Sequence, residues 1–224
     1  MAEPVNYRLE YSKMGCMKFI GHIDLMKLYH KLFRMSGLPV VFSQGFNPHQ
    51  IFTIAHPLSL GMEGTAEIAD FRLSAAAGGG DIADALSAKM PQGLSLTGVR
   101  PLETGEKNCA GLVAAADYTV TMGETPGLSS AAASILARAE VITSKRTKSG
   151  TSQQDIRPDI HTLTASDSGA VHMRISAGST ANLKPQLVVS EIFRELGLSY
   201  DEHASDYRRT RLLCRQGGAF APIL

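Results

Sequence analysis

The same succession of strand and helix patterns occurs twice along this chain of 224 residues. Residues 7–12 (YRLEYS) alternate aromatic or apolar with polar side chains, which is typical of a strand with one buried face. Residues 22–37 then place apolar side chains three and four apart on one helical face. The members of this face are Leu25, Leu28, Tyr29, Leu32 and Met35. Further strand patterns lie at 40–43, 51–55, 66–73 and 94–99, and a weaker helical pattern lies at 82–90. If the short strands merge, the order is β-α-β-β-α-β.

The second half repeats this order of elements without a residue-by-residue match to the first. Its strand patterns lie at 116–122, 141–147, 160–166, 170–178 and 207–215, and its helical patterns lie at 129–141 and 185–197. A polar, glycine-bearing stretch at 103–112 joins the halves. The sequence therefore predicts an α+β fold of two tandem ferredoxin-like sandwiches, each a four-stranded antiparallel sheet covered on one face by two helices. We expect these units to span residues 1–105 and 112–224.

Charge and cysteine usage exclude several classes of protein. The formal net charge of +1 gives no overall attraction to nucleic acids or membranes, so electrostatic recognition would depend on local patches. Cys16, Cys109 and Cys214 lie far apart and form no C-x-x-C pair, which indicates a reducing compartment without a disulfide framework or cysteine-built metal site. No apolar run approaches the roughly 20 residues of a membrane span. The N-terminus lacks a signal-peptide pattern, and we expect a cytoplasmic protein.

A turn with the sequence Gly-Phe-Asn-Pro-His, residues 45–49, separates two short strand patterns. Reversing the chain requires residues such as glycine, asparagine or proline, each for its own backbone reason. It does not require Phe46 or His49. Either these two side chains fold back under the turn, or the turn contacts a ligand or partner.

The polar face of the first helix carries a row of basic residues. Lys27, His30, Lys31 and Arg34 are spaced three, one and three apart, opposite the apolar face, and we call this row the basic ridge. A charged helix face is most often simply solvated. The alternative is that the basic ridge contacts phosphate groups, since only Asp24 offsets its charge.

Four histidines lie in the first quarter of the chain: His22, His30, His49 and His56. None of the usual metal-ligand spacings occurs among them, so we expect neither a metal nor another cofactor. His22 could act as a general acid or base because imidazole titrates near neutrality. A histidine beside a helix start is more often structural, and no nucleophile is identified.

Basic residues in the second half suggest two further contact points. Lys148 precedes a polar stretch that ends in a corner formed by residues 155–158 (DIRP). Asp155 could pair with Arg157 or cap the turn, or Arg157 could present its planar fork to a phosphate. Lys184 closes a polar loop before the last helix, whose N-terminus could offer backbone N–H groups to an anion.

Residues 11–49 resemble the radical-SAM-associated family of uncharacterised bacterial proteins. The family pattern runs from Lys-x-Gly through Phe-Ile-Ser-His-Leu-Asp-Leu and a basic helix to Gly-Leu-Pro and Ser-x-Gly-Phe-Asn-Pro-His. The matching residues are Lys13, Gly15, Phe19, Ile20, His22, Asp24, Leu25, Arg34, Gly37, Leu38, Pro39, Ser43, Gly45, Phe46, Asn47, Pro48 and His49. Looser matches at Lys148, 155–158 and 183–185 extend the resemblance over nearly the whole chain. Gly21 replaces the usual serine, and Lys27 and Lys31 replace arginines.

The resemblance implies an accessory role. Relatives in this family are fused to a radical-SAM enzyme or encoded beside one, and the family's own activity is not established. The radical-SAM cluster requires three cysteines in a C-x-x-x-C-x-x-C run, which this chain lacks. The chain therefore resembles the associated domain rather than the catalyst.

These observations lead to three functional hypotheses. The first is a non-catalytic accessory module that binds RNA or presents it to a radical-SAM partner. The second is a protein–protein docking module for such a partner without RNA contact. The third is a metal-free endoribonuclease that uses His22 or His49 as acid or base. The contact residues we predict are Lys13, His22, Lys27, Lys31, Arg34, Phe46, Asn47, His49, Lys148, Asp155, Arg157 and Lys184.

Overall fold

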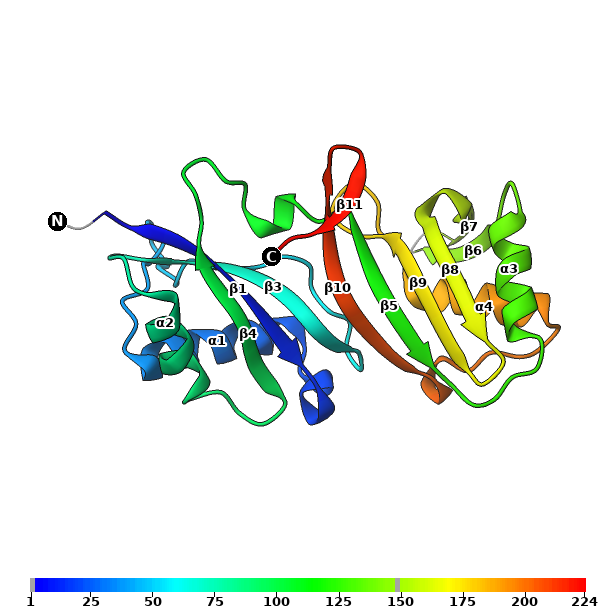
Figure 1. The fold of residues 1–224 in the computed structure, drawn as a ribbon, viewed down its shortest axis with the longest axis horizontal. Coiled ribbons are helices and arrows are strands. Elements are labelled where there is room, and N and C mark those ends of the chain that lie inside the picture. The colour runs from blue at the N-terminus through cyan, green and yellow to red at the C-terminus, as the bar shows by residue number, and fades with distance from the viewer. Residues whose placement is uncertain (1–2, 148–149) are drawn as a thin grey trace. The chain divides into compact units, whose positions relative to one another are not determined.

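The computed structural model describes residues 3–147 and 150–224, which form an α+β fold with four α-helices and a large β-sheet (Figure 1). The predicted α+β class is therefore confirmed. The chain divides into two compact units. The first contains the residues up to Val113 together with Arg211–Leu224, and the second contains Ala114–Thr210. Within the described residues, no helix is long and apolar enough to cross a membrane.

The first unit contains two helices and a set of antiparallel strands. The elements are β1 (Val5–Lys13), α1 (His22–Ser36), β2 (Phe52–Ile54), β3 (Glu63–Leu73), α2 (Gly79–Ser87) and β4 (Leu94–Pro101). Strand β1 pairs with β3 on one side and β4 on the other. Residues 69–71 of β3 pair with both β1 and β2, so β3 lies between those two strands. The strand order is β4-β1-β3-β2, with every neighbour antiparallel.

Aromatic packing fixes α1 against this sheet. Tyr7 and Tyr11 point to one face of β1, and both are about 1% exposed. Tyr29 of α1 packs with its ring centroid 5.3 Å from that of Tyr11, and Phe33 lies 5.1 Å from Phe71 of β3. Offset and edge-on aromatic pairs of this kind add stability beyond the area that they bury. Phe33 is fully buried between the helix and the sheet.

The apolar stripe of α1 differs from the prediction at two residues, because Phe33, which we did not predict, is buried and Met35 is not. Met35, which we expected on the buried face, is 49% exposed. The helix ends at Ser36, and Gly37 follows in the left-handed region with φ +71°, where glycine costs little. Met35 lies in the last turn, beyond the part of the helix that packs on the sheet.

The opposite face of β1 and β3 is covered by the segment after β4. Arg8 is fully buried there and makes a bidentate ion pair with Asp70, at 2.8 and 3.0 Å. Glu106 of the covering segment lies 2.8 Å from Arg8, and the backbone N–H of Cys109 donates to Asp70 at 2.7 Å. A buried charge is stable only when paired and hydrogen-bonded. These contacts hold the stretch predicted as a polar joint against the first unit.

The second unit has the same alternation of strands and helices. Its elements are β5 (Ala115–Thr121), α3 (Leu128–Ala137), β8 (Ile160–Ser166), β9 (Ala170–Ser176), α4 (Pro185–Glu195) and the first part of β10 (Asp206–Gln216). The residues of β10 from Arg211 onward belong to the first unit. The strand order is β10-β5-β9-β8, and the β5–β9 and β9–β8 pairs are antiparallel. Pro185 begins α4 at a position where its missing N–H costs no hydrogen bond.

The strands β7 (Gly150–Asp155) and β11 (Ala219–Pro222) were not predicted, whereas β6 (Ile142–Thr147) matches the predicted strand at 141–147. Strands β6 and β7 form a separate hairpin, and β7 lies in the stretch that we interpreted as a polar loop. Strand β11 pairs with the end of β10. Short 3₁₀ helices occupy Gly15–Phe19, Cys109–Gly111, Arg157–Asp159 and Glu202–Ala204.

Candidate functional site

The basic ridge lies on the exposed side of α1. Lys27, Lys31 and Arg34 are exposed, whereas the opposite side of the helix is buried. The ammonium of Lys27 lies 3.3 Å from the carboxylate of Asp24, and both side chains are about 70% exposed. An exposed pair of this kind contributes little stability. Lys31 and Arg34 form no ion pair with any described residue, so their charges face solvent.

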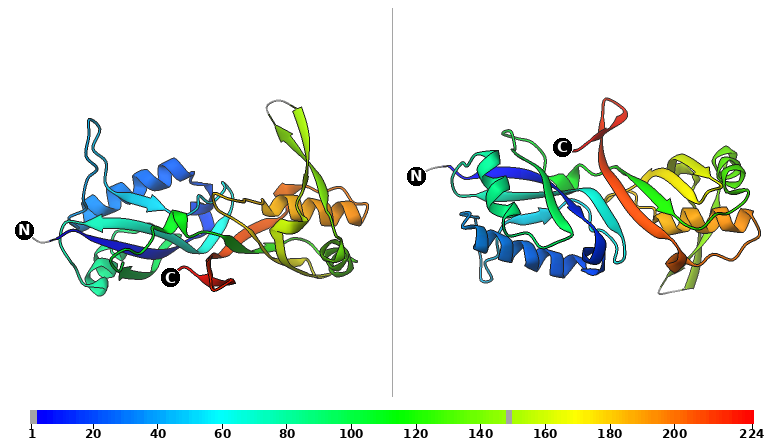
Figure 2. Two further views of the ribbon diagram at one scale, coloured as in Figure 1. Left: turned by 90° about the horizontal axis from the view of Figure 1, so that it is seen from above. Right: turned by 60° about the horizontal axis from the view of Figure 1, so that its bottom comes forward.

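The turn after α1 is a narrow closed loop. The backbone N–H of Ser43 donates to the carbonyl of His49 at 2.7 Å, and Oγ of Ser43 lies 2.9 Å from Nδ1 of His49. Phe42 and Gln50 form a single antiparallel bridge at the base. Gly45 has φ +121°, which a residue with a side chain rarely adopts. This segment connects α1 to β2 along the chain, and in Figure 2 (left) it projects from the first unit.

Phe46 and His49, the two turn residues that chain reversal does not require, do not fold back into the core. Phe46 is fully exposed at the tip, at 105% of its reference area. Asn47 and His49 are also exposed. Solvated phenylalanine is unusual because burying an aromatic ring is strongly favourable. The turn therefore presents an apolar ring that is open to solvent.

His30 connects the basic ridge to the turn. Its ring is partly buried, with its centroid 6.3 Å from that of Phe52. Burial lowers the pKa of His30, and the charges of His49 and Arg34 lower it further. Like charges affect one another's pKa in this way only when they are near. The charges of the turn and of the basic ridge therefore both act on this imidazole.

Two predicted contact residues are part of the internal structure instead. Lys13 is only 1% exposed, and its ammonium lies 3.4 Å from the carbonyl of Lys18. The guanidinium of Arg157 donates to the carbonyls of Leu136 and Ile160, at 3.0 and 2.9 Å. Backbone carbonyls thus engage Nε and Nη1 of Arg157, and Lys13 is buried.

The other predicted residues lie apart from this surface or outside the described structure. His22 is the exposed first residue of α1. Asp155 accepts the backbone N–H groups of Val141 and Arg157 through Oδ1, at 2.8 and 3.0 Å, and so caps the corner. Lys184 is exposed immediately before α4. Lys148 lies outside the described residues.

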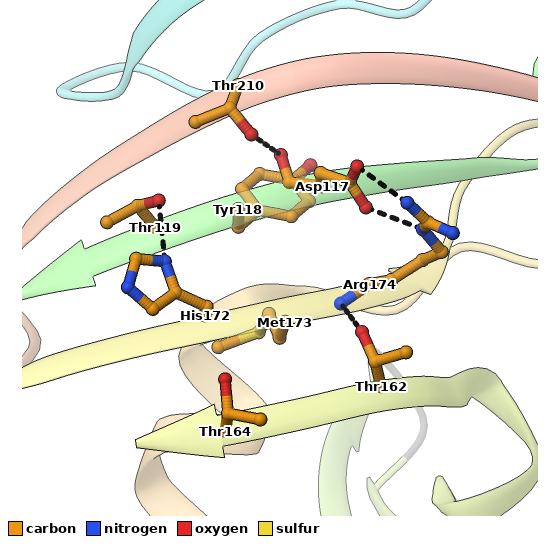
Figure 3. A pocket seen from close by; sticks show the side chains of 9 residues that line it. All are labelled: Asp117, Tyr118, Thr119, Thr162, Thr164, His172, Met173, Arg174 and Thr210. Carbon is orange, nitrogen blue, oxygen red and sulfur yellow. Dashed lines mark hydrogen bonds and ion pairs between the residues drawn. The ribbon is translucent and has the colours of Figure 1, made fainter. Parts of the chain in front are cut away.

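The second unit has a polar pocket on its sheet that the sequence did not indicate (Figure 3). The pocket has a volume of about 280 Å³ and is lined by Asp117, Tyr118, Thr119, Thr162, Thr164, His172, Met173, Arg174 and Thr210. Arg174 makes two hydrogen bonds to Asp117, at 2.7 and 3.0 Å, and Thr119 lies 3.1 Å from Nδ1 of His172. These cross-strand pairs already satisfy the charged groups. Alternating polar residues on a strand are ordinary, so no sequence signal distinguishes this face.

Among the described residues, no three His, Cys, Asp or Glu side chains lie together in a group that could hold a metal ion.

Comparison with known proteins identifies the family. A family model described as an uncharacterized protein conserved in bacteria (DUF2344) matches residues 6–185. No curated protein matches the sequence. One similar solved structure is that of an unknown protein from Galdieria sulphuraria, 12% identical, with 92% of this chain and 98% of that chain covered and a TM-score of 0.28. We draw nothing from a likeness at this score. Since the family model covers most of its length, the chain belongs to DUF2344, a family of uncharacterized proteins conserved in bacteria.

Proposed function

We propose that this protein is a non-catalytic accessory module that binds single-stranded RNA through its first unit and presents it to a partner radical-SAM enzyme. The observation that carries the proposal is the full exposure of Phe46 in the turn that follows α1, the helix whose exposed face carries Lys31 and Arg34. Proteins that bind single strands combine a basic surface for the backbone with aromatic rings on which bases stack. The radical-SAM partner comes from the sequence resemblance alone.

We further propose that the two units are tandem ferredoxin-like sandwiches. The order β4-β1-β3-β2 in the first unit, with helices after β1 and β3, supports this assignment. The order β10-β5-β9-β8 in the second unit, with helices after β5 and β9, supports it equally. On this assignment the hairpin of β6 and β7 is an insertion after the first helix of the second unit.

Docking to a protein partner without RNA is the second candidate. Three large apolar side chains near the start of α1 are strongly exposed: Phe19 at 65%, Ile23 at 68% and Leu60 at 67%. The backbone N–H of Gly61 donates to the carbonyl of Lys18 at 2.9 Å, which brings Leu60 close to Phe19 in space. Exposed apolar groups that cluster are characteristic of protein interaction sites.

Salt-dependent binding of a fluorescent single-stranded RNA distinguishes the two candidates. Each phosphate contact contributes about 0.7 to the slope of log affinity against log salt on single strands. Lys31→Ala and Arg34→Ala should each reduce that slope by about this amount. Phe46→Ala should weaken binding by about 1–3 kcal/mol without changing the slope, because stacking releases no counterions. Lys89→Ala, an exposed lysine after α2, is the matched control and should bind as the wild type does.

The outcome that overturns the RNA proposal is unaltered binding in Lys31→Ala, Arg34→Ala and Phe46→Ala while all three remain folded. That result would favour docking through the apolar cluster around Phe19. The RNA should also remain intact after prolonged incubation. Cleavage that is lost in His22→Gln or His49→Gln would instead establish the endoribonuclease hypothesis.

A further inference from the structure

Three side chains that can carry positive charge, His30, Arg34 and His49, lie near one another in the first unit. His30 and Arg34 are four residues apart on α1, which makes them neighbours on the helix surface. The base of the closed turn is near this pair, because His49 precedes Phe52 by three residues and the ring centroid of Phe52 lies 6.3 Å from that of His30. The charge of His49 also lowers the pKa of His30. The turn and the segments beside it, residues 37–52, contain no carboxylate, and Asp24 is the only acidic residue of α1. Strand β2, which contacts the ring of His30 through Phe52, contains no titratable residue.

Polar atoms at this point lack partners. Nε2 of His30 is buried and makes no hydrogen bond within the described structure. Gln50, the residue after His49, is only 6% exposed, and its Oε1 is unpartnered too. Buried polar atoms nearly always have a hydrogen-bond partner, and leaving one unsatisfied is destabilising. Of these two atoms, only Nε2 of His30 can donate to an anion, when it carries a proton. A buried potential donor beside basic groups is what an unfilled anion site would leave.

The orientation of His49 fits the same interpretation. Its Nδ1 is held 2.9 Å from Oγ of Ser43, and its backbone N–H donates to the same oxygen at 3.1 Å. These contacts fix the ring and leave Nε2 for another partner, since no described residue bonds to it. Arg34 is exposed and offers a planar fork suited to phosphate oxygens.

We propose that His30, Arg34 and His49 bind a terminal phosphate monoester of RNA. This inference rests on the proposed RNA-binding function and specifies which part of the RNA the surface recognises. A backbone phosphodiester carries a single negative charge, whereas a terminal monoester carries about −1.5 to −2 near neutral pH and offers three oxygens. Three basic groups around one point match the monoester better. The same chemistry occurs at a 5′ end and at a 3′ end.

Proton uptake should accompany binding. In the free protein, the neighbouring positive charges and burial favour neutral His30. A bound dianion reverses the local potential and stabilises protonated imidazole at His30. The binding heat at neutral pH should therefore differ between two buffers with different heats of ionisation, by an amount that corresponds to net uptake of protons. Hydroxyl-ended RNA should show smaller uptake.

The test compares oligouridylates of one length that end in a 5′-phosphate, a 3′-phosphate or hydroxyls at both ends. We expect the full-length protein to bind one of the phosphorylated forms roughly tenfold more tightly than the hydroxyl form, as charge-assisted hydrogen bonds to a dianion would give. His30→Gln and His49→Gln should each reduce the ratio between the affinities for the phosphorylated and the hydroxyl form from roughly tenfold to about one, whatever their effect on the hydroxyl form itself. His203→Gln, an exposed histidine of the second unit, is the control and should keep the preference.

The outcomes separate this inference from the proposed function. Equal affinity for all three oligouridylates overturns the phosphate site and leaves RNA binding intact. Absence of binding to all three overturns both. Retention of the preference in both histidine variants places the recognition elsewhere and overturns the assignment. If His30→Gln unfolds, His49→Gln decides alone, because His49 is exposed and outside the core.

Discussion

Oγ of Ser43 lies 2.9 Å from Nδ1 of His49 and accepts the backbone N–H of the same residue at 3.1 Å. One hydroxyl therefore closes the turn and orients the imidazole at its base. The tip of the turn, including Phe46, makes no comparable contact and is open to solvent. The turn thus combines a fixed base with an exposed ring, and its stability and its recognition can be tested separately.

Phe46 and Phe52 are the matched pair for that test. Phe46→Ala should leave the free energy of unfolding within about 0.5 kcal/mol of wild type, since substitutions at exposed positions are usually that small. Phe52 is 5% exposed and packs with its ring centroid 4.6 Å from that of Tyr29. Phe52→Ala should therefore cost about 3–5 kcal/mol. Denaturant unfolding measures both, and a comparable loss in Phe46→Ala would show that the ring is buried.

The contact between Glu106 and two arginines should make stability depend on acid pH. Hydrogen bonds from Arg100, at 2.7 and 2.9 Å, lower the pKa of Glu106 to about 2, and the charge of Arg8 contributes. Because the native pKa lies below the unfolded value near 4.5, the stabilisation is complete above that value. It is lost as pH falls through the native pKa. Glu106→Gln should lower stability at pH 7 by about 1–3 kcal/mol.

The difference between wild type and Glu106→Gln should shrink as pH falls from about 4.5 toward about 2, where the wild-type carboxylate is protonated too. Denaturant midpoints measured at intervals across this range give the dependence. Glu103→Gln, an exposed carboxylate in the same segment, serves as the control and should show no such convergence. A constant difference at every pH would mean that Glu106 contributes through packing rather than charge.

The parts of the fold that could be predicted are those in which apolar residues recur with the period of a helix or a strand. The helix from His22 to Ser36 has a continuous apolar stripe and a glycine after its end, so its limits were predicted within one residue. Strand β7 was missed because Gly150–Asp155 is entirely polar. Its hairpin is separate from the main sheet, and such a strand carries no burial pattern to detect.

For the candidate site, too, local sequence patterns predicted only part of the structure. Helical spacing predicted that the basic ridge would be exposed, because the periodic pattern decides which helix face meets solvent. For Phe46 the sequence left open whether the ring folds back under the turn or meets a ligand. The burial of Lys13 and the use of Arg157 by backbone carbonyls depend on residues that are distant in sequence. Leu136, one acceptor for Arg157, lies 21 positions away. A single sequence does not reveal such partners, and RNA contact itself remains a prediction.

Arg157 should be important for stability rather than for binding. Its guanidinium donates to carbonyl oxygens at the end of α3 and at Ile160, the start of β8. Arg157→Ala should leave these acceptors without that donor and cost about 1.5–3 kcal/mol, the range for hydrogen bonds to charged groups. Lys184→Ala is the comparison, since Lys184 is exposed and should cost less than about 0.5 kcal/mol. Thermal or urea unfolding checks both, and equal stability of the two variants would contradict this role.

The three cysteines should differ sharply in reactivity toward a thiol reagent. Cys16 is exposed, whereas Cys109 and Cys214 are buried. Burial raises the pKa of Cys109 to about 12, and the nearby carboxylate of Asp70 adds to the rise, so its thiolate is scarce at neutral pH. Iodoacetamide at pH 7.5 should therefore add one group to the native protein and three after unfolding. Cys16→Ser should remove the fast adduct.

Labelling of Cys109 should also report release of the segment that covers Arg8. The backbone N–H of Cys109 donates to Asp70, and its Sγ lies 3.5 Å from the carbonyl of Thr53. Asp70→Asn weakens the attachment by removing the charge that pairs with Arg8. In a Cys16→Ser background this substitution should speed alkylation of Cys109 more than that of Cys214, as followed by peptide mass spectrometry. Equal acceleration at both cysteines would indicate global destabilisation and contradict a local attachment at Asp70.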